Sequence, residues 1–287
     1  MKSGLRSWTI PMLFAMVLLL LSSFASACDS ETASAETGMG GSEVATDAEE
    51  TSADDQSLLV AVASSLREAF MEIGQAFDQT HNAETTMTFD SSGSLQKQIE
   101  AGAPVDVFAS AAMLQVDRLL EQRLVDEASV TTFAGNELVL AVPADSRLGV
   151  SSFEDLADEK VERVTTGDPV NAPHGKAAVE ILTHLGLIEQ VEPKLIYSKN
   201  ASQTLTYVVQ GEVDAGILFS TDATLGGDKV TVVATSDPGW HSEIVYVLSL
   251  VSAGQKKALA QEFIDFVKGP EARTVLERYG YILPTAD

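Results

Sequence analysis

The chain has 287 residues, a hydrophobic share of 45% and a formal net charge of −24, from 18 Lys and Arg against 42 Asp and Glu. This length can bury the core of one large domain or of two ordinary ones. The acidity argues against a nucleic-acid binder, which normally carries a basic patch. Cys28 is the only cysteine, which excludes an intramolecular disulfide and any multi-cysteine metal centre.

Residues 1–28 are typical of an export signal. Lys2 and Arg6 precede an apolar run at 11–21, which is too short to span a bilayer. The small residues Ala25 and Ala27 then lead to Cys28, and this stretch resembles a bacterial lipobox, although the usual leucine is replaced by Ala25. Ordinary cleavage after Ala27 is the alternative. We expect a lipoprotein-type signal and a lipid anchor on Cys28, outside the cytoplasm.

Residues 29–56 predict a second non-globular segment. It holds nine acidic residues and no Lys or Arg, and most of its other residues are Ser, Thr, Ala and Gly. Such a composition buries too little apolar area to offset the entropy of ordering. We expect a flexible acidic tether between the anchor and the folded part.

From Ser57 onward, strand and helix patterns alternate. Strands are expected at 58–63, 85–89, 105–110, 137–142, 161–166, 194–197, 215–219, 229–235 and 244–250. Helices are expected from 64 to 77 and at 94–101, 113–121, 176–185, 202–210, 256–268 and 271–279, with a capping box from Ser151 to Glu154 opening a short one. The alternation predicts an α/β protein with mixed, mostly parallel sheets, and the length favours two lobes.

Five loops that follow strands and begin helices share one chemistry. They lie at 64–65, 91–94, 167–175, 198–202 and 219–222 and are rich in Ser, Thr, Asn and Gly. Backbone N–H groups and hydroxyls at helix starts can hold an anion without Lys or Arg. Each serine alone is more often a simple helix cap. Together, at the carboxyl ends of strands, they predict a site for an anion or a polar small molecule.

Six segments carry a family resemblance. Residues 60–66, 89–95, 98–106, 135–140, 167–169 and 278–281 resemble, in order, the periplasmic molybdate-binding proteins of ABC importers. The resemblance implies a two-lobed, periplasmic-binding-protein-like type II clamshell with helices on both faces of its sheets. Lobe I would comprise 57–136 plus 244–287 and lobe II 137–243, with the chain crossing at 137–142 and around 240–244.

The resemblance also implies a set of ligand-binding groups. Molybdate would accept hydrogen bonds from the hydroxyls of Ser65 and Ser92 and from the backbone N–H groups of His174 and Ala201, whereas Phe219 stands where the family has a tyrosine hydroxyl. Further candidates around the ligand are Ser64, Ser91, Gly93, Ser198, Ser220 and Thr221. Asp90 must point away from a dianion. The His174 ring either lies in solvent at the lip of the cleft or adds a pH-sensitive donor.

The function implied is that of a monomeric solute-binding component that captures molybdate, and also tungstate, and delivers it to a membrane permease and its ATPase. Molybdenum would be present only within the oxyanion, with no cofactor and no metal cation. Sulfate, thiosulfate and phosphate are the alternative ligands, and a signalling module is another alternative.

An enzyme is not expected. Ser94 and Lys97 fit the S-x-x-K signature of penicillin-binding acyl enzymes, and residues 198–200 fit S-x-N, but Lys-Thr-Gly is absent. We expect Ser94 to be the helix N-cap and Lys97 to be solvated. The four histidines lack metal-ligand spacing.

Overall fold

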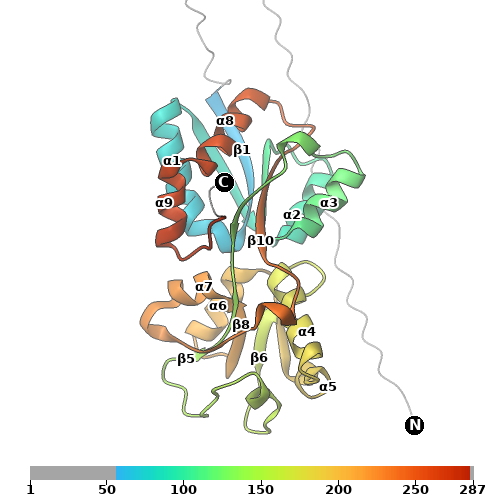
Figure 1. The fold of residues 1–287 in the computed structure, drawn as a ribbon, viewed down its shortest axis with the longest axis vertical. Coiled ribbons are helices and arrows are strands. Elements are labelled where there is room, and N and C mark those ends of the chain that lie inside the picture. The colour runs from blue at the N-terminus through green and yellow to red at the C-terminus, as the bar shows by residue number, and fades with distance from the viewer. Residues whose placement is uncertain (1–55, 285–287) are drawn as a thin grey trace, which may run out of the picture. The chain divides into compact units, whose positions relative to one another are not determined.

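The computed structural model describes residues 56–284. The expected signal, Cys28 and almost all of the expected tether lie outside this range. The strands are β1 (Ser57–Ala63), β2 (Glu84–Asp90), β3 (Val107–Ser110), β4 (Thr131–Gly135), β5 (Leu138–Pro143), β6 (Val164–Gly167), β7 (Leu195–Ser198), β8 (Ala215–Phe219), β9 (Val230–Thr235) and β10 (Val245–Leu250). The helices are α1 (Arg67–His81), α2 (Ser92–Glu100), α3 (Met113–Glu121), α4 (Pro173–His184), α5 (Ile188–Val191), α6 (Ala201–Val209), α7 (Ser220–Gly226), α8 (Lys257–Lys268) and α9 (Pro270–Arg278), shown in Figure 1.

The strands form two mixed five-stranded sheets, in the orders β2-β1-β3-β10-β4 and β7-β6-β8-β5-β9. In the first sheet β1 pairs in parallel with β2 and β3, and in the second sheet β6 pairs in parallel with β7 and β8. Strands β10 and β5 pair antiparallel with both of their neighbours. Parallel pairs are therefore half of the pairings rather than most of them. The chain passes between the sheets at residues 136–137, where β4 leads into β5, and again at 236–244.

Helices cover both faces of the first sheet, and alternate side chains of β1 pack against the helices on opposite faces. Val60 and Val62 join the apolar cluster that contains Phe70 of α1 and Phe263 of α8. Ala61, which points the other way, joins the cluster of α2 and α3. Figure 1 shows α8 and α9 beside α1 on this sheet.

The second sheet has the same construction. Leu138 and Leu140 of β5 share a cluster with Ile181 of α4, and Val139 and Ala141 face the side where α6 and α7 lie. Because helices cover both faces, the loops that leave the strand ends are the places where polar groups gather. The expected mixed α/β fold with two sheets is confirmed.

Most expected elements are present, with ends shifted by a few residues. The capping box from Ser151 to Glu154 is wrong. Asp155, one residue further on, accepts hydrogen bonds from the backbone N–H and hydroxyl of Ser151 and from the N–H of Ser152, and only a short 3-10 turn follows. Strand β4 and helix α5 were not anticipated, and α7 is the helix that the loop at 219–222 was expected to begin. Within residues 56–284, no helix is both long and apolar enough to cross a bilayer.

Candidate functional site

Most of the predicted ligand-binding residues surround one small cavity. It is lined by Ala63, Ser64, Ser65, Ser91, Ser92, Ala111, Ala172, Pro173, His174, Ala201 and Phe219. Its volume is about 10 Å³, close to what one water molecule needs. The lining comes from loops of both sheets, so the cavity lies where strand ends of the two sheets face each other.

Ser65 lies in the 3-10 turn (Ser64–Leu66) that joins β1 to α1 and is 3% exposed. The Tyr246 hydroxyl of β10 donates to Ser65 Oγ at 3.2 Å. The Tyr281 hydroxyl donates to the backbone carbonyl of Ser65. Two buried tyrosines therefore fix both the turn and the side chain.

Ser91 and Ser92 have different structural roles. Ser91 Oγ accepts from the N–H of Ser94 at 3.2 Å and so caps α2. The N-cap role expected of Ser94 is therefore wrong, because the helix begins at Ser92. Ser92 Oγ accepts from the N–H of Ala111 at 2.9 Å, which links the end of β2 to the end of β3 past the one strand, β1, that lies between them. Its hydroxyl hydrogen remains for another acceptor.

Ser64, which follows β1 of the first sheet, is hydrogen-bonded to Ala201, which comes after β7 of the second sheet. The N–H of Ala201, the first residue of α6, donates to Ser64 Oγ at 3.1 Å. The hydroxyl of Ser202 donates to the Ser64 carbonyl at 3.3 Å. Asn200 caps this helix by accepting from the N–H of Gln203. A contact between protein groups thus holds the Ala201 N–H at the cavity wall.

The His174 ring is buried, at 1% exposure, so the expected place at a solvent lip is wrong. Its Nε2 lies 2.8 Å from the Thr204 hydroxyl, and burial lowers its pKa to about 3. The ring is therefore neutral near pH 7 and is not a cationic donor. The backbone N–H of His174 lies in the first turn of α4, where a helix provides no acceptor for it.

Gly167 explains how this ring fits. A Cβ there would lie 2.5 Å from His174 Cε1 and 2.6 Å from the Ala172 Cβ. Because Gly167 has no side chain, the His174 ring can pack against the end of β6.

Phe219 is 1% exposed and lines the cavity without a polar atom to offer. Its ring centroid lies 5.4 Å from that of His174 and 6.0 Å from that of Tyr246. It fills the apolar space between these two rings.

Four further candidates do not line the cavity. The N–H of Gly93 donates to the Asn171 carbonyl at 2.8 Å. Ser198 Oγ bonds to the Thr204 hydroxyl and the Asn200 carbonyl. Ser220 Oγ donates to Asn136 Oδ1, and Thr221 Oγ1 accepts from Asn136 Nδ2, each at 2.8 Å. Their polar groups bond to the protein behind the cavity wall.

Charged side chains are kept away from the cavity, and among its described lining residues none is Lys, Arg, Asp or Glu. Asp90 accepts from the N–H of Ser91 at 2.7 Å and from Asn200 Nδ2 at 3.4 Å, which holds its carboxylate at the rim. Lys97 is not simply solvated, because its Nζ donates to Asn171 Oδ1 at 2.6 Å.

Sequence reasoning missed the residues that support the site. Asn136 and Tyr281 fall within segments that carried the resemblance, which was a usable signal. Tyr246 gave no such signal, because in the sequence it is one more residue of an expected buried strand. Thr204 gave none either, because it is an ordinary residue within an expected helix.

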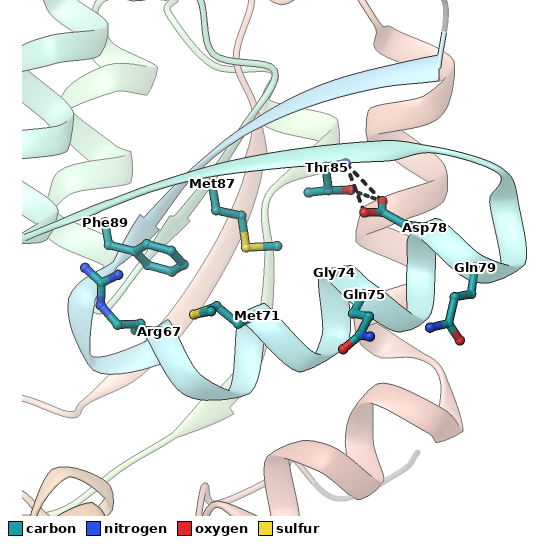
Figure 2. Close-up of a pocket in the computed structure, with 9 residues that line it drawn as sticks. All are labelled: Arg67, Met71, Gly74, Gln75, Asp78, Gln79, Thr85, Met87 and Phe89. Atoms are coloured by element: carbon teal, nitrogen blue, oxygen red, sulfur yellow. Dashed lines mark hydrogen bonds between the residues drawn. The ribbon is translucent and has the colours of Figure 1, made fainter. Parts of the chain in front are cut away.

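A larger cavity lies elsewhere. A groove of about 650 Å³ lies between α1 and the edge strand β2. Figure 2 shows its lining, where Met71, Met87 and Phe89 provide apolar surface and Asp78 bonds to Thr85. It contains none of the predicted site residues. In the described part of the chain, no group of three or more His, Cys, Asp or Glu side chains is placed to hold a metal ion.

The arrangement suits an anion. Hydroxyls with a hydrogen to spare and backbone N–H groups at two helix starts converge without a carboxylate among them, and such preoriented dipoles stabilise negative charge in a buried place.

Comparison with known proteins also indicates a protein that binds a solute. The family model described as "Bacterial extracellular solute-binding protein" matches residues 58–282. The chain belongs to this family. It is thus related to proteins that bind solutes outside the cytoplasm rather than to an enzyme family.

Two curated relatives are informative. The "Putative ABC transporter substrate-binding lipoprotein YvgL" of Bacillus subtilis is 37% identical over 225 residues, covering 78% of this chain and 85% of that protein. The molybdate-binding protein ModA of Escherichia coli is 32% identical over 240 residues, covering 80% and 91%.

Solved structures agree. A Clostridium difficile structure described as "substrate binding domain of putative molybdenum ABC transporter" has 34% identity and a TM-score of 0.62, covering 79% of this chain and 99% of that one. The periplasmic molybdate-binding protein of Azotobacter vinelandii, at 24% identity and TM-score 0.71, covers 79% and 100% and supports the fold.

Proposed function

We propose that this protein is the solute-binding component of an ABC importer and that it captures molybdate or tungstate in the cavity described above. The observation that carries the proposal is the convergence of Ser65, Ser92, His174 and Ala201 on one small cavity. The relatives that bind molybdate support the choice of ligand. The hydroxyls of the two serines and the N–H groups of the other two residues would donate to the oxyanion.

The directions of the hydrogen bonds support an anion that carries no proton. Ser65 Oγ accepts from Tyr246, and Ser92 Oγ accepts from Ala111. Each hydroxyl then has one of its two lone pairs engaged by the protein and keeps its hydrogen for a ligand. Molybdate, tungstate and sulfate only accept hydrogen bonds, whereas phosphate keeps a proton near neutrality and needs an acceptor. Phosphate is thereby disfavoured, and the longer metal–oxygen bonds of molybdate would distinguish it from sulfate by size.

Capture requires the walls of the cavity to separate, because a four-oxygen anion is larger than about 10 Å³ allows. We place the two lobes at 57–136 plus 244–287 and at 137–243, hinged at the two crossings. Opening would break the bond between the Ala201 N–H and Ser64 Oγ. On closing, that N–H would pass to the ligand.

Beyond the described residues, the proposal includes a lipid anchor on Cys28 and an acidic tether at 29–56. The lipoprotein among the relatives supports the anchor. The protein would act as a monomer that delivers its anion to a membrane permease driven by an ATPase. It would catalyse no reaction.

A calorimetric titration of the chain lacking residues 1–28 with molybdate, tungstate, sulfate, thiosulfate and phosphate tests the ligand. We expect the first two to bind much more tightly than the others. Preferred binding of sulfate or thiosulfate would favour the alternative oxyanion carriers, and binding of none would refute the proposal.

A further inference from the structure

Behind Ser65, buried polar groups form a chain of hydrogen bonds that reaches from the crossing between the sheets to the cavity. Asn136 Nδ2 donates to the Tyr246 hydroxyl at 2.9 Å. The Tyr246 hydroxyl in turn donates to Ser65 Oγ at 3.2 Å. Asn136 is 7% exposed, Ser65 3% and Tyr246 0%, so no bulk solvent competes for these bonds.

The direction of this chain is fixed at its far end. Asn136 Oδ1 accepts from the backbone N–H of Glu137 at 2.9 Å, and a backbone N–H can only donate. The amide therefore has its oxygen toward Glu137 and its Nδ2 toward Tyr246. Since the Tyr246 oxygen receives that hydrogen, its own hydrogen goes to Ser65. Burial raises the pKa of Tyr246 above its usual range, which keeps that hydrogen in place.

Ser65 is the last member of the chain. Its Oγ accepts from Tyr246, so its single hydrogen is free to point into the cavity that it lines. A serine without such a partner can rotate and offer either a hydrogen or a lone pair. The partner occupies one of the two lone pairs and so narrows this freedom before any ligand arrives.

We propose that Tyr246 is a positioning residue for the bound oxyanion: its hydroxyl occupies a lone pair of Ser65 and biases Ser65 toward donating, and the site thereby favours oxyanions that carry no proton. This inference rests on the proposed function, because it assumes an oxyanion next to Ser65. It adds a residue that does not itself line the cavity.

The chain offers a matched control. Tyr281 is also buried, at 6% exposure, and its ring lies 5.3 Å from that of Tyr246. Its hydroxyl donates to the backbone carbonyl of Ser65 and not to the side chain. Tyr281→Phe therefore removes a neighbouring hydroxyl without changing what Ser65 Oγ accepts.

The experiment compares calorimetric affinities for molybdate and for hydrogenarsenate, a tetrahedral dianion that carries one proton at slightly alkaline pH. In the wild type we expect a strong preference for molybdate. Tyr246→Phe should lower molybdate affinity by about tenfold and hydrogenarsenate affinity much less, because the freed serine can accept from the protonated ligand. Tyr281→Phe should leave the ratio of the two affinities at the wild-type value, even where its melting temperature falls.

A double-mutant cycle tests the route of action. With Ser65→Ala in place, Tyr246→Phe should no longer change the ratio. Asn136→Asp provides a second variant if Tyr246→Phe does not fold: a carboxylate there accepts from Tyr246, turns the chain around and should lower the ratio likewise.

Two failures are distinguishable. If the wild-type protein binds none of the oxyanions, the proposed function fails and takes this inference with it. If the wild type binds molybdate but Tyr246→Phe keeps the wild-type ratio, or changes it equally with and without Ser65, only the positioning role of Tyr246 is refuted.

Discussion

Replacing Gly93 by alanine should weaken oxyanion binding while leaving helix α2 at least as stable. Gly93 lies in the first turn of α2. Its N–H donates at 2.8 Å to the carbonyl of Asn171, which lies in the loop between β6 of the second sheet and α4. A Cβ on Gly93 would lie 2.6 Å from the Asn171 oxygen and 2.7 Å from its Cα. These are backbone atoms, so no rotation of a side chain relieves the clash.

The size of the effect follows from this geometry. An ordinary contact of at least 3.4 Å requires the facing segments to separate by roughly 0.8 Å, and the 2.8 Å hydrogen bond is then lost. Overpacking of this kind costs about 1–3 kcal/mol. Binding that needs the closed arrangement should weaken by roughly 5- to 150-fold. The open form has no such clash, and alanine stabilises a helix relative to glycine by up to about 1 kcal/mol.

The assay is molybdate titration together with the melting temperature of the unliganded protein. We expect a lower affinity with an unchanged or slightly raised melting temperature. Lys97→Ala is the control, because it removes a bond to Asn171 Oδ1 at the same place without adding volume, and an exposed bond of this kind contributes little. Equal affinity of Gly93→Ala and the wild type would refute the closing motion that we propose.

Other substitutions test other parts of the proposal. Ser65→Ala and Ser92→Ala should each cost about 1.5–3 kcal/mol of molybdate binding, because a dianion loses a charge-assisted donor; wild-type affinity in both would place the ligand elsewhere. Phe219→Tyr should raise molybdate affinity several-fold in the same titration, and no gain would mean that the para position of the ring does not reach the anion. Asp222 is 2% exposed and burial raises its pKa to about 8 from 3.8, so the folded protein keeps a proton that the unfolded chain releases; its contribution to stability therefore falls as the pH rises from about 4 to 8. Melting curves of Asp222→Asn should lack this part of the pH dependence, and a profile parallel to the wild type would contradict the raised pKa. Cys28→Ser should release the protein from the membrane fraction without changing affinity, and a variant that stays with the membrane would rule out lipid anchoring.

The fold and the cavity were predictable because both depend on local patterns. Buried strands appear as short apolar runs, and the loops after them are visible as clusters of Ser, Gly and Asn. Ser64, Ser65, Ser91 and Ser92 reach the cavity because β1 and β2 are adjacent and parallel, so their following loops meet at one edge.

The partners of those residues were not predictable, because they come from distant segments. Tyr246 lies 181 residues from Ser65 and reaches it only because β10 returns to the first sheet, antiparallel to β3. A single sequence does not specify that pairing. The burial of His174 depends in the same way on Gly167 and Thr204, each from another element. The polar residues of a loop are visible in the local sequence, whereas the residues that hold their side chains in place come from distant segments.

The strong acidity of the chain is compatible with an anion site for the same structural reason. Exposed charges act through solvent and are screened within about 8–10 Å at ordinary ionic strength, whereas the donors at the cavity act at hydrogen-bond distance. The nearby carboxylates also do not act directly on the bound anion: Asp90 is held at the rim by two N–H donors, and the raised pKa of Asp222 leaves it uncharged at neutral pH. The net charge therefore acts on the approach of the ligand, as a salt-dependent reduction of the association rate, and not on the strength with which the closed site holds it.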